Sequence, residues 1–206
     1  MNIGLCGGTF DPFHRGHLDP ILSARRTMQW DRVVYIPAWR QPFKLEHDGA
    51  SPWSRFAMTV LATQDVDFAD VSPVELERGT VSYTVDTLRE FRGATGDAKL
   101  DWIIGDDNLA RLLEWKSIET ILELANFAVL TRNGGDDLPA ALRPRVAAAA
   151  DRPKCGAIVF VHNPTVPVSS TAIRARVRAG QSIDDLVDSR VARYIHHYGL
   201  YSKGQP

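Results

Sequence analysis

The stretch Gly7-Gly8-Thr9-Phe10-Asp11-Pro12-Phe13-His14-Arg15-Gly16-His17 follows a short apolar run at 3–6 and precedes apolar residues at helical spacing. This order predicts a strand, a glycine-rich turn and the beginning of a helix. In α/β proteins such a turn binds phosphate, because free backbone N–H groups and the positive end of the helix point out of it. His14 and His17 are three residues apart and would lie on one side of a helical turn. We therefore predict that this turn binds a polyphosphate.

Strand-like and helical segments alternate along the rest of the chain. Strands are predicted at 3–6, 33–36, 71–76, 100–104, 127–131 and 157–161. Helical spacing occurs over 18–28, 55–63, 85–91, 109–113, 118–122 and 187–198, and the alanine-rich stretch 140–150 is predicted to be another helix. Such alternation is typical of a mostly parallel sheet with helices on both faces. We predict an α/β, Rossmann-like doubly wound fold that binds its ligand at the carboxyl ends of the strands.

Length and composition favour one domain. The chain has 206 residues, of which 44% are hydrophobic and 24% are charged, so it can bury a sizeable core. No linker composition divides it. We predict a single domain over 1–206, with a helical C-terminal part from about residue 169. The segments 40–52 and 133–137 are predicted loops.

Several classes of protein are disfavoured. The formal net charge of −1 argues against attachment to nucleic acid or to an acidic membrane by bulk charge. Cys6 and Cys155 have no ligand spacing and are expected to be reduced. Because no signal peptide or membrane span is visible, we expect a soluble, cytoplasmic protein. Neither GxGxxG nor GxxxxGK[ST] occurs, which disfavours dehydrogenases and P-loop NTPases. Whether the chain forms a homo-oligomer is left open.

The two histidines have plainer interpretations as helix caps or as a metal pair. A metal site is not predicted, since no third ligand stands at a telling spacing. Imidazolium N–H groups donate charge-assisted hydrogen bonds to phosphate oxygens. A helix N-terminus lowers the pKa of a histidine, whereas a bound triphosphate raises it, so His14 and His17 would become cationic when a nucleotide arrives.

A second anion site is predicted after the last strand, at 168–174. Ser169 or Ser170 can cap a helix there, and capping alone would account for the hydroxyls. Arg174 lies one turn further along, so the same segment can also bind an anion. Two anion sites on one edge of a sheet suit a single triphosphate better than two separate ligands.

Other candidates follow the fourth strand and the loops. Gly105 would let a ligand approach closely, and Asp106 or Asp107 could accept hydrogen bonds from a ribose, although either could equally cap the next helix. The stretch 82–84 is predicted to cap the helix at 85–91. By its position alone Trp115 is more typical of a core than of a stacking platform. Lys44 and Arg132 are candidate cations for phosphate.

Together these stretches resemble the bacterial nicotinate-nucleotide adenylyltransferases. The resemblance rests on GGTFDPFHRGH at 7–17, ERG at 77–79, SYTVDTL at 82–88, IGDD at 104–107, Trp115, SSTAIR at 169–174, VARYI at 191–195 and LY at 200–201. It covers nearly the whole chain in order. The HxGH part alone is shared by a wide nucleotidyltransferase superfamily. The SYT–DTL stretch and Trp115 narrow the resemblance to the nicotinate-nucleotide adenylyltransferases.

The resemblance implies transfer of AMP from ATP, with Mg²⁺ as cofactor, to nicotinic acid mononucleotide within NAD biosynthesis. The products would be nicotinic acid adenine dinucleotide and pyrophosphate. No covalent intermediate is implied, because the 5′-phosphate of the mononucleotide attacks the α-phosphorus in line. Such a transfer depends on positioning and charge neutralisation rather than on a nucleophilic side chain.

Matching positions assign the site residues. The ATP site would comprise Gly7, Gly8, Thr9, Phe10, His14, His17, Gly105, Asp107, Ser169, Ser170, Thr171 and Arg174. Gly105 and Asp107 would hold the ribose, and Lys44 would reach the phosphates from its loop. The expected catalytic residues are His14, His17, Lys44 and Arg174. The mononucleotide site would comprise Thr84, Trp115, Lys116 and Arg132, with Thr84 at the nicotinate carboxylate and Trp115 stacked on the pyridine ring.

Three features depart from the family pattern. Asp106 stands where a small or uncharged residue is expected, Arg15 adds a cation to the histidine turn, and 40–43 lacks the usual proline-rich run. Two alternatives remain open. One is a transferase of the same fold acting on another substrate such as phosphopantetheine, although those chains are typically shorter and lack the SYT–DTL and Trp115 stretches. The other is a non-catalytic nucleotide-binding regulator.

Overall fold

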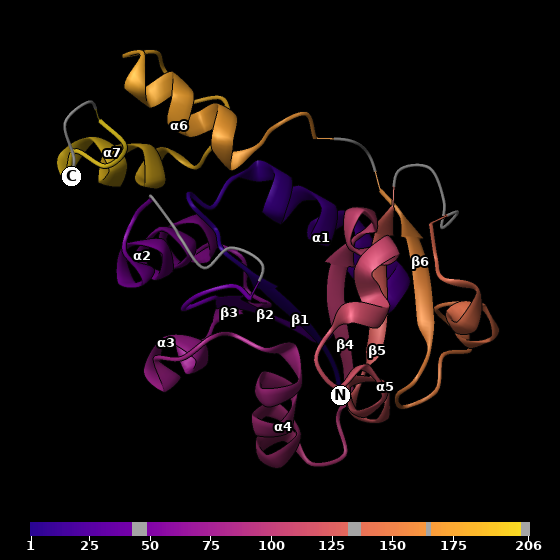
Figure 1. Ribbon diagram of the computed structural model, residues 1–206. Coiled ribbons are helices and arrows are strands. Elements are labelled where there is room, and N and C mark those ends of the chain that lie inside the picture. Colours follow the sequence, from indigo (N-terminus) through magenta and orange to yellow (C-terminus); the bar gives the residue numbers. More distant parts are fainter. Residues whose placement is uncertain (43–48, 132–136, 164–165, 203–206) are drawn as a thin grey trace.

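A single parallel sheet forms the centre of the molecule. The structure is a computed structural model that describes residues 1–42, 49–131, 137–163 and 166–202. Six strands lie in the order β3-β2-β1-β4-β5-β6 (Figure 1). Their bounds are β1 Asn2–Gly8, β2 Arg32–Pro37, β3 Ala69–Val71, β4 Lys99–Gly105, β5 Asn126–Thr131 and β6 Ile158–His162. All five strand pairs are parallel. The predicted α/β, doubly wound fold is thus confirmed.

Helices cover the sheet on both faces (Figure 1). The α-helices are α1 Arg15–Met28, α2 Pro52–Thr63, α3 Val74–Arg78, α4 Thr84–Thr95, α5 Ile118–Leu124, α6 Ser170–Arg178 and α7 Ser189–His197. Two 3₁₀ helices, η1 Asp106–Glu114 and η2 Ala140–Arg145, complete the described elements. Two buried apolar clusters result. One joins α1, α2, α6 and α7 to the sheet, and the other joins α4, η1 and α5 to its opposite face.

The strand order reverses beside β1. From β1 the chain moves outward through β2 and β3, returns to β4 on the other side of β1, and continues to β5 and β6. The carboxyl ends of β1 and β4 therefore flank the topological switch point, where ligands bind in open α/β sheets. The glycine turn that follows β1 and Gly105 at the end of β4 both lie there.

Two predicted elements were wrong. The strand predicted at 71–76 ends at Val71, and residues from Val74 form α3. Pro73 explains this change, since it cannot donate to a strand ladder and its fixed φ suits a helix start. The helix predicted at 140–150 is only the short 3₁₀ helix η2. Pro144 interrupts the helical hydrogen bonds, and Val146 then forms a bridge with Ile158.

The start of two helices also differs from prediction. Ser82 does not cap α4: its hydroxyl accepts a hydrogen bond from Trp39 N at 3.0 Å, and α4 begins without a side-chain cap. The terminal helix begins at Ser189 rather than at 187, because Asp188 accepts from Arg190 N at 2.8 Å and caps it.

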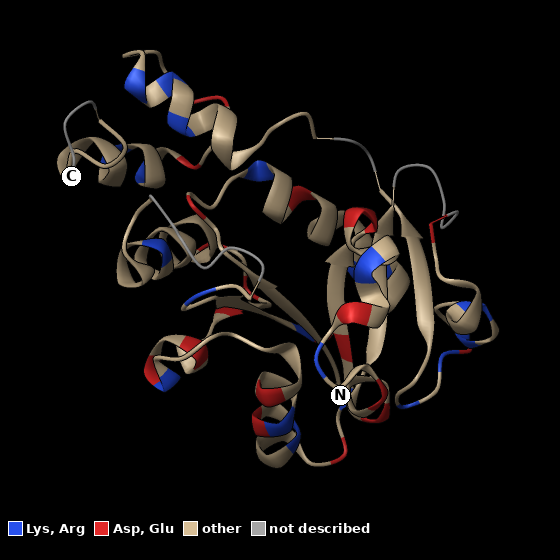
Figure 2. Cartoon of the chain, viewed as in Figure 1, with Lys and Arg blue, Asp and Glu red and all other residues tan. Residues whose placement is uncertain are grey.

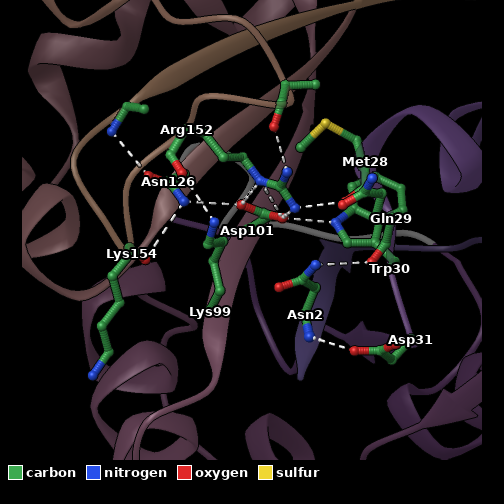
Figure 3. Close-up of polar contacts among 12 residues, drawn as sticks. Asn2, Met28, Gln29, Trp30, Asp31, Lys99, Asp101, Asn126, Arg152 and Lys154 are labelled. Atoms are coloured by element: carbon green, nitrogen blue, oxygen red, sulfur yellow. Dashed lines mark hydrogen bonds and ion pairs between the residues drawn. The ribbon is translucent and has the colours of Figure 1, made fainter.

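A buried ion pair ties the segment after η2 to the sheet (Figure 3). Asp101 on β4 is fully buried and accepts from Arg152 Nε at 3.1 Å and Nη2 at 3.0 Å. Trp30 Nε1 and Asn126 Nδ2 donate to the same carboxylate at 2.8 and 3.0 Å. Arg152 also donates to the carbonyl oxygens of Ala149 and Met28. Both charges are therefore paired and hydrogen-bonded, as burial requires.

Candidate active site

A cavity of about 1300 Å³ opens at the carboxyl ends of β1 and β4. Its walls include every predicted site residue that lies within the described ranges: Gly7, Gly8, Thr9, Phe10, His14, His17, Thr84, Gly105, Asp107, Trp115, Lys116, Ser169, Ser170, Thr171 and Arg174. Lys44 and Arg132 lie outside the described residues. The structure thus brings residues from five segments of the chain to one site, while their roles stay predictions.

The glycine turn is closely packed behind the cavity. A Cβ on Gly8 would lie 2.6 Å from the Phe10 ring, so only glycine allows the backbone to pass there. Buried Arg55 from α2 supports the turn by donating to Thr9 O at 2.6 Å and to Ala38 O at 2.7 Å. Burial lowers the pKa of Arg55, and the nearby Asp11 carboxylate acts against that shift. Sequence reasoning missed Arg55, because a lone arginine in an amphipathic helix carries no signal of burial.

The two histidines stack on each other at the start of α1. Their ring centroids are 3.7 Å apart with planes inclined by 22°. His17 Nδ1 accepts from His14 N at 3.2 Å, which places the proton of neutral His17 on Nε2. His14 Nδ1 is buried and finds no hydrogen-bond partner among the described residues. Both histidines line the cavity, so a ligand bound there would lie next to the two rings.

Both imidazoles are neutral in the free protein at pH 7. Burial lowers the pKa of His14 to about 4. Burial also lowers the pKa of His17 well below its ordinary value, and the neighbouring His14 lowers it further. The downward direction agrees with the sequence-based expectation, but burial rather than the helix dipole is its main cause. An anionic ligand would reverse the shift by stabilising the charged form.

We expect the free protein to become less stable as the pH decreases below 6.5. The unfolded chain protonates His14 near pH 6.5 and the folded protein near pH 4, so the unfolded state binds more protons between these values. Between pH 7.5 and pH 5 His14 alone costs about 2 kcal/mol of unfolding free energy. Urea unfolding at the two pH values, compared with His14→Asn, measures this. If His14→Asn lost as much unfolding free energy between the two pH values as the wild type, a lowered pKa of His14 would be contradicted.

The start of α6 lies against the glycine turn. Ser169 caps the helix by accepting from Ala172 N at 3.2 Å, as predicted. Ser170 Oγ donates to Pro12 O at 3.1 Å, and Arg174 Nη1 donates to Asp11 O at 2.7 Å. The two predicted anion sites are thus in direct contact. Figure 2 shows that α6 carries basic and no acidic residues, which suits a polyanion beside its N-terminus.

At the end of β4 the Asp107 carboxylate lies against the backbone of Gly105. A Cβ on Gly105 would lie 2.5 Å from Asp107 Oδ1, so the absence of a side chain makes room for this carboxylate. Asn108 Nδ2 donates to Asp107 Oδ1 at 3.0 Å and fixes it further. Asp106, the departure from the family pattern, accepts from Thr131 Oγ1 at 3.1 Å and so links the ends of β4 and β5.

The predicted mononucleotide side of the cavity contains aromatic and charged residues. Trp115 follows η1, is half-buried, and packs edge to face on Phe127 with centroids 5.9 Å apart. Lys116 Nζ lies 3.1 Å from Asp86 Oδ2 and 4.2 Å from the Tyr83 ring centroid. Both contacts lie at the surface, where such an ion pair is weak.

Glu75 is a buried cavity residue that sequence reasoning missed. It lies on α3, and its carboxylate accepts from Thr87 Oγ1 at 2.6 Å. Burial raises the pKa of Glu75, while hydrogen bonds from Ser82 and Thr87 act in the opposite direction. The segment had been predicted as a strand, so no pattern singled out this carboxylate. Its contacts join α3 to α4 and to the turn that precedes it.

The fold and the site define a nucleotidyltransferase of the cytidylyltransferase-like class, whose family model matches residues 5–176. A probable nicotinate-nucleotide adenylyltransferase of Thermoanaerobacter sp. (strain X514) is 35% identical over 209 residues, covering 100% of this chain and 96% of the relative. One of the same name from Streptomyces coelicolor is 39% identical over 196 residues, covering 95% and 98%. The chain therefore belongs to the nicotinate-nucleotide adenylyltransferase family, and the resemblance seen in the motifs is confirmed.

Solved structures show the same fold. The Plasmodium falciparum nicotinic acid mononucleotide adenylyltransferase complexed with NaAD superposes with a TM-score of 0.72 at 17% identity, over 97% of both chains. The same protein complexed with APC gives a TM-score of 0.71 over 97% of this chain and 96% of that one. Within the described ranges no helix has the length and apolar character that crossing a bilayer requires.

Proposed function

We propose that AMP passes from ATP to nicotinic acid mononucleotide in the cavity between the glycine turn and α6, as a step of NAD biosynthesis. The 5′-phosphate oxygen of the mononucleotide forms a bond to the α-phosphorus of ATP. The bond from that phosphorus to the bridging oxygen breaks and releases pyrophosphate, leaving nicotinic acid adenine dinucleotide. Family membership over nearly the full length supports this reaction.

One observation carries the assignment of the ATP site. Ser170 and Arg174 of α6 donate to backbone oxygens of the glycine turn, so both anion sites face one space. His14 and His17 enter neutral; a bound triphosphate favours protonation of His14, while His17, whose Nδ1 accepts from His14 N, donates through Nε2. They then stabilise the negative charge that develops on the leaving pyrophosphate, and no covalent intermediate forms. Lys44 and Arg132 remain proposed contributors from sequence matching alone.

Magnesium fits this site as an ion carried by the nucleotide. Among the described residues no group of three or more His, Cys, Asp or Glu side chains is placed to hold a metal ion. Magnesium commonly binds through substrate phosphates and one or two carboxylates, and keeps waters as its other ligands. When bound it would neutralise phosphate charge, while the residues of the chain orient the two substrates.

The other end of the cavity is the proposed mononucleotide site. Thr84 at the start of α4 would contact the nicotinate carboxylate, in part through backbone N–H groups, and Trp115 would stack on the pyridine ring. Lys116 is also proposed to belong to this mononucleotide site. We also propose that 1–206 is one domain with a helical C-terminal part from about 169, and that it acts in the cytoplasm.

Release of pyrophosphate from ATP and magnesium tests this function. We expect turnover with nicotinic acid mononucleotide, at least tenfold less with nicotinamide mononucleotide, and none with phosphopantetheine. A tenfold preference needs only ~1.4 kcal/mol, which is within the range of one hydrogen bond to a carboxylate. Turnover with none of the three substrates would remove the proposed reaction. Equal turnover with the acid and the amide would remove the proposed selectivity.

A further inference from the structure

The Asp11 carboxylate at the base of the active site contacts residues from distant parts of the chain. Asp11 is 2% exposed, and its Oδ1 accepts from Tyr201 OH at 2.6 Å and from Ala50 N at 3.1 Å. Its Oδ2 lies 3.5 Å from Arg174 Nη1, which also donates to the backbone oxygen of Asp11. Asp11 thus contacts Arg174 on α6, Tyr201 after α7, and Ala50 just before α2.

Arg174 is held before any nucleotide binds. Its side chain is one-fifth exposed and lines the cavity, while Nη1 is engaged by both the carboxylate and the carbonyl oxygen of Asp11. A long arginine side chain loses rotamer freedom when a ligand fixes it. A guanidinium already anchored through one nitrogen avoids most of that cost and presents its remaining N–H groups in a fixed direction.

Tyr201 is placed to fix that carboxylate. It follows α7, is 5% exposed, and directs its hydroxyl at Asp11 Oδ1. Burial and the Asp11 charge raise the pKa of Tyr201, so the phenol keeps its proton and acts as the donor. A hydrogen bond from a neutral donor to a buried carboxylate is among the stronger kinds.

We propose that Tyr201 and Asp11 are positioning residues that orient the Arg174 guanidinium toward the triphosphate. The segment that follows α7 would then take part in catalysis without touching substrate. This inference rests on the proposed role of Arg174 at the phosphates.

A double-mutant cycle tests the inference. The four proteins are the wild type, Tyr201→Phe, Arg174→Ala and the double variant, assayed for kcat and KM with ATP and the mononucleotide. We expect Tyr201→Phe to lower kcat/KM for ATP about tenfold and to change KM for the mononucleotide less than twofold. In the Arg174→Ala background, removing the hydroxyl should cost less than twofold, because its effect passes through Arg174. Tyr198→Phe, an exposed tyrosine on the same C-terminal part, should match the wild type.

The outcomes separate the possible failures. An equal loss in both backgrounds would show that Tyr201 acts independently of Arg174 and would overturn the inference. Full activity of Tyr201→Phe would also overturn it. Unchanged activity of Arg174→Ala would instead overturn the proposed phosphate role of Arg174. Should Tyr201→Phe fail to unfold cooperatively on heating, Asp11→Asn takes its place in the cycle, with the same non-additivity expected.

Discussion

His17→Ala is expected to lower kcat by about 10²–10³-fold, as loss of one preorganised donor at a developing anion does in other enzymes. The structure supplies the physical reason. His17 Nδ1 is occupied by the backbone N–H of His14, so Nε2 carries the proton and is the nitrogen that can donate to a phosphate oxygen. Stacking on His14 fixes the plane of the ring, and alanine removes the donor without adding bulk.

Steady-state release of pyrophosphate measures this effect, and thermal unfolding shows that the variant is folded. His196→Ala is the matched control, because His196 is an exposed histidine on α7 and should keep wild-type kcat. A His17→Ala protein with more than a third of wild-type kcat would contradict the role of the glycine turn in catalysis. The same result would leave the family and the fold unaffected.

Asp101→Ala is expected to lower the free energy of unfolding by about 3–5 kcal/mol. The substitution leaves the buried Arg152 guanidinium without its carboxylate, and the Trp30 indole N–H and the Asn126 amide each lose an acceptor. Whole domains are stable by only about 5–15 kcal/mol, so a loss of this size would be visible in expression as well as in urea unfolding.

The chain contains a control pair of the same chemistry at its surface. Asp97 is fully exposed and lies 2.7 Å from Lys154 Nζ. Solvent screens such a pair, so Asp97→Ala should change the unfolding free energy far less than Asp101→Ala does. Equal effects of Asp101→Ala and Asp97→Ala would show that the buried pair contributes no more than a surface pair.

Local patterns predicted most of the secondary structure, and their failures have local causes. Apolar runs placed five of the six strands within two residues of their observed bounds, since buried parallel strands are continuously apolar. Pro73 and Pro144 ended the two elements that were predicted wrongly. Each proline overrode a favourable composition, because it removes a backbone donor whatever its neighbours are.

Part of the candidate site was also predicted from local patterns. His14, His17 and the serines at 169 and 170 stand in short stretches whose spacing indicates helix starts beside strands. Glu75 and Arg55 were missed, since a charged residue in a helical pattern is ordinarily solvated. Their burial depends on which elements pack together, and the sequence pattern within one element does not encode that.

The sequence by itself determined the order of the elements, the parallel sheet, the glycine turn with its two histidines and the family. These features depend on spacings of a few residues, which periodicity and short motifs record directly. Only the tertiary structure decided that Asp11 meets Arg174 and Tyr201, across separations of 163 and 190 residues. It also decided that the histidines are neutral in the free protein, because burial lowers their pKa values and burial exists only once the chain has folded.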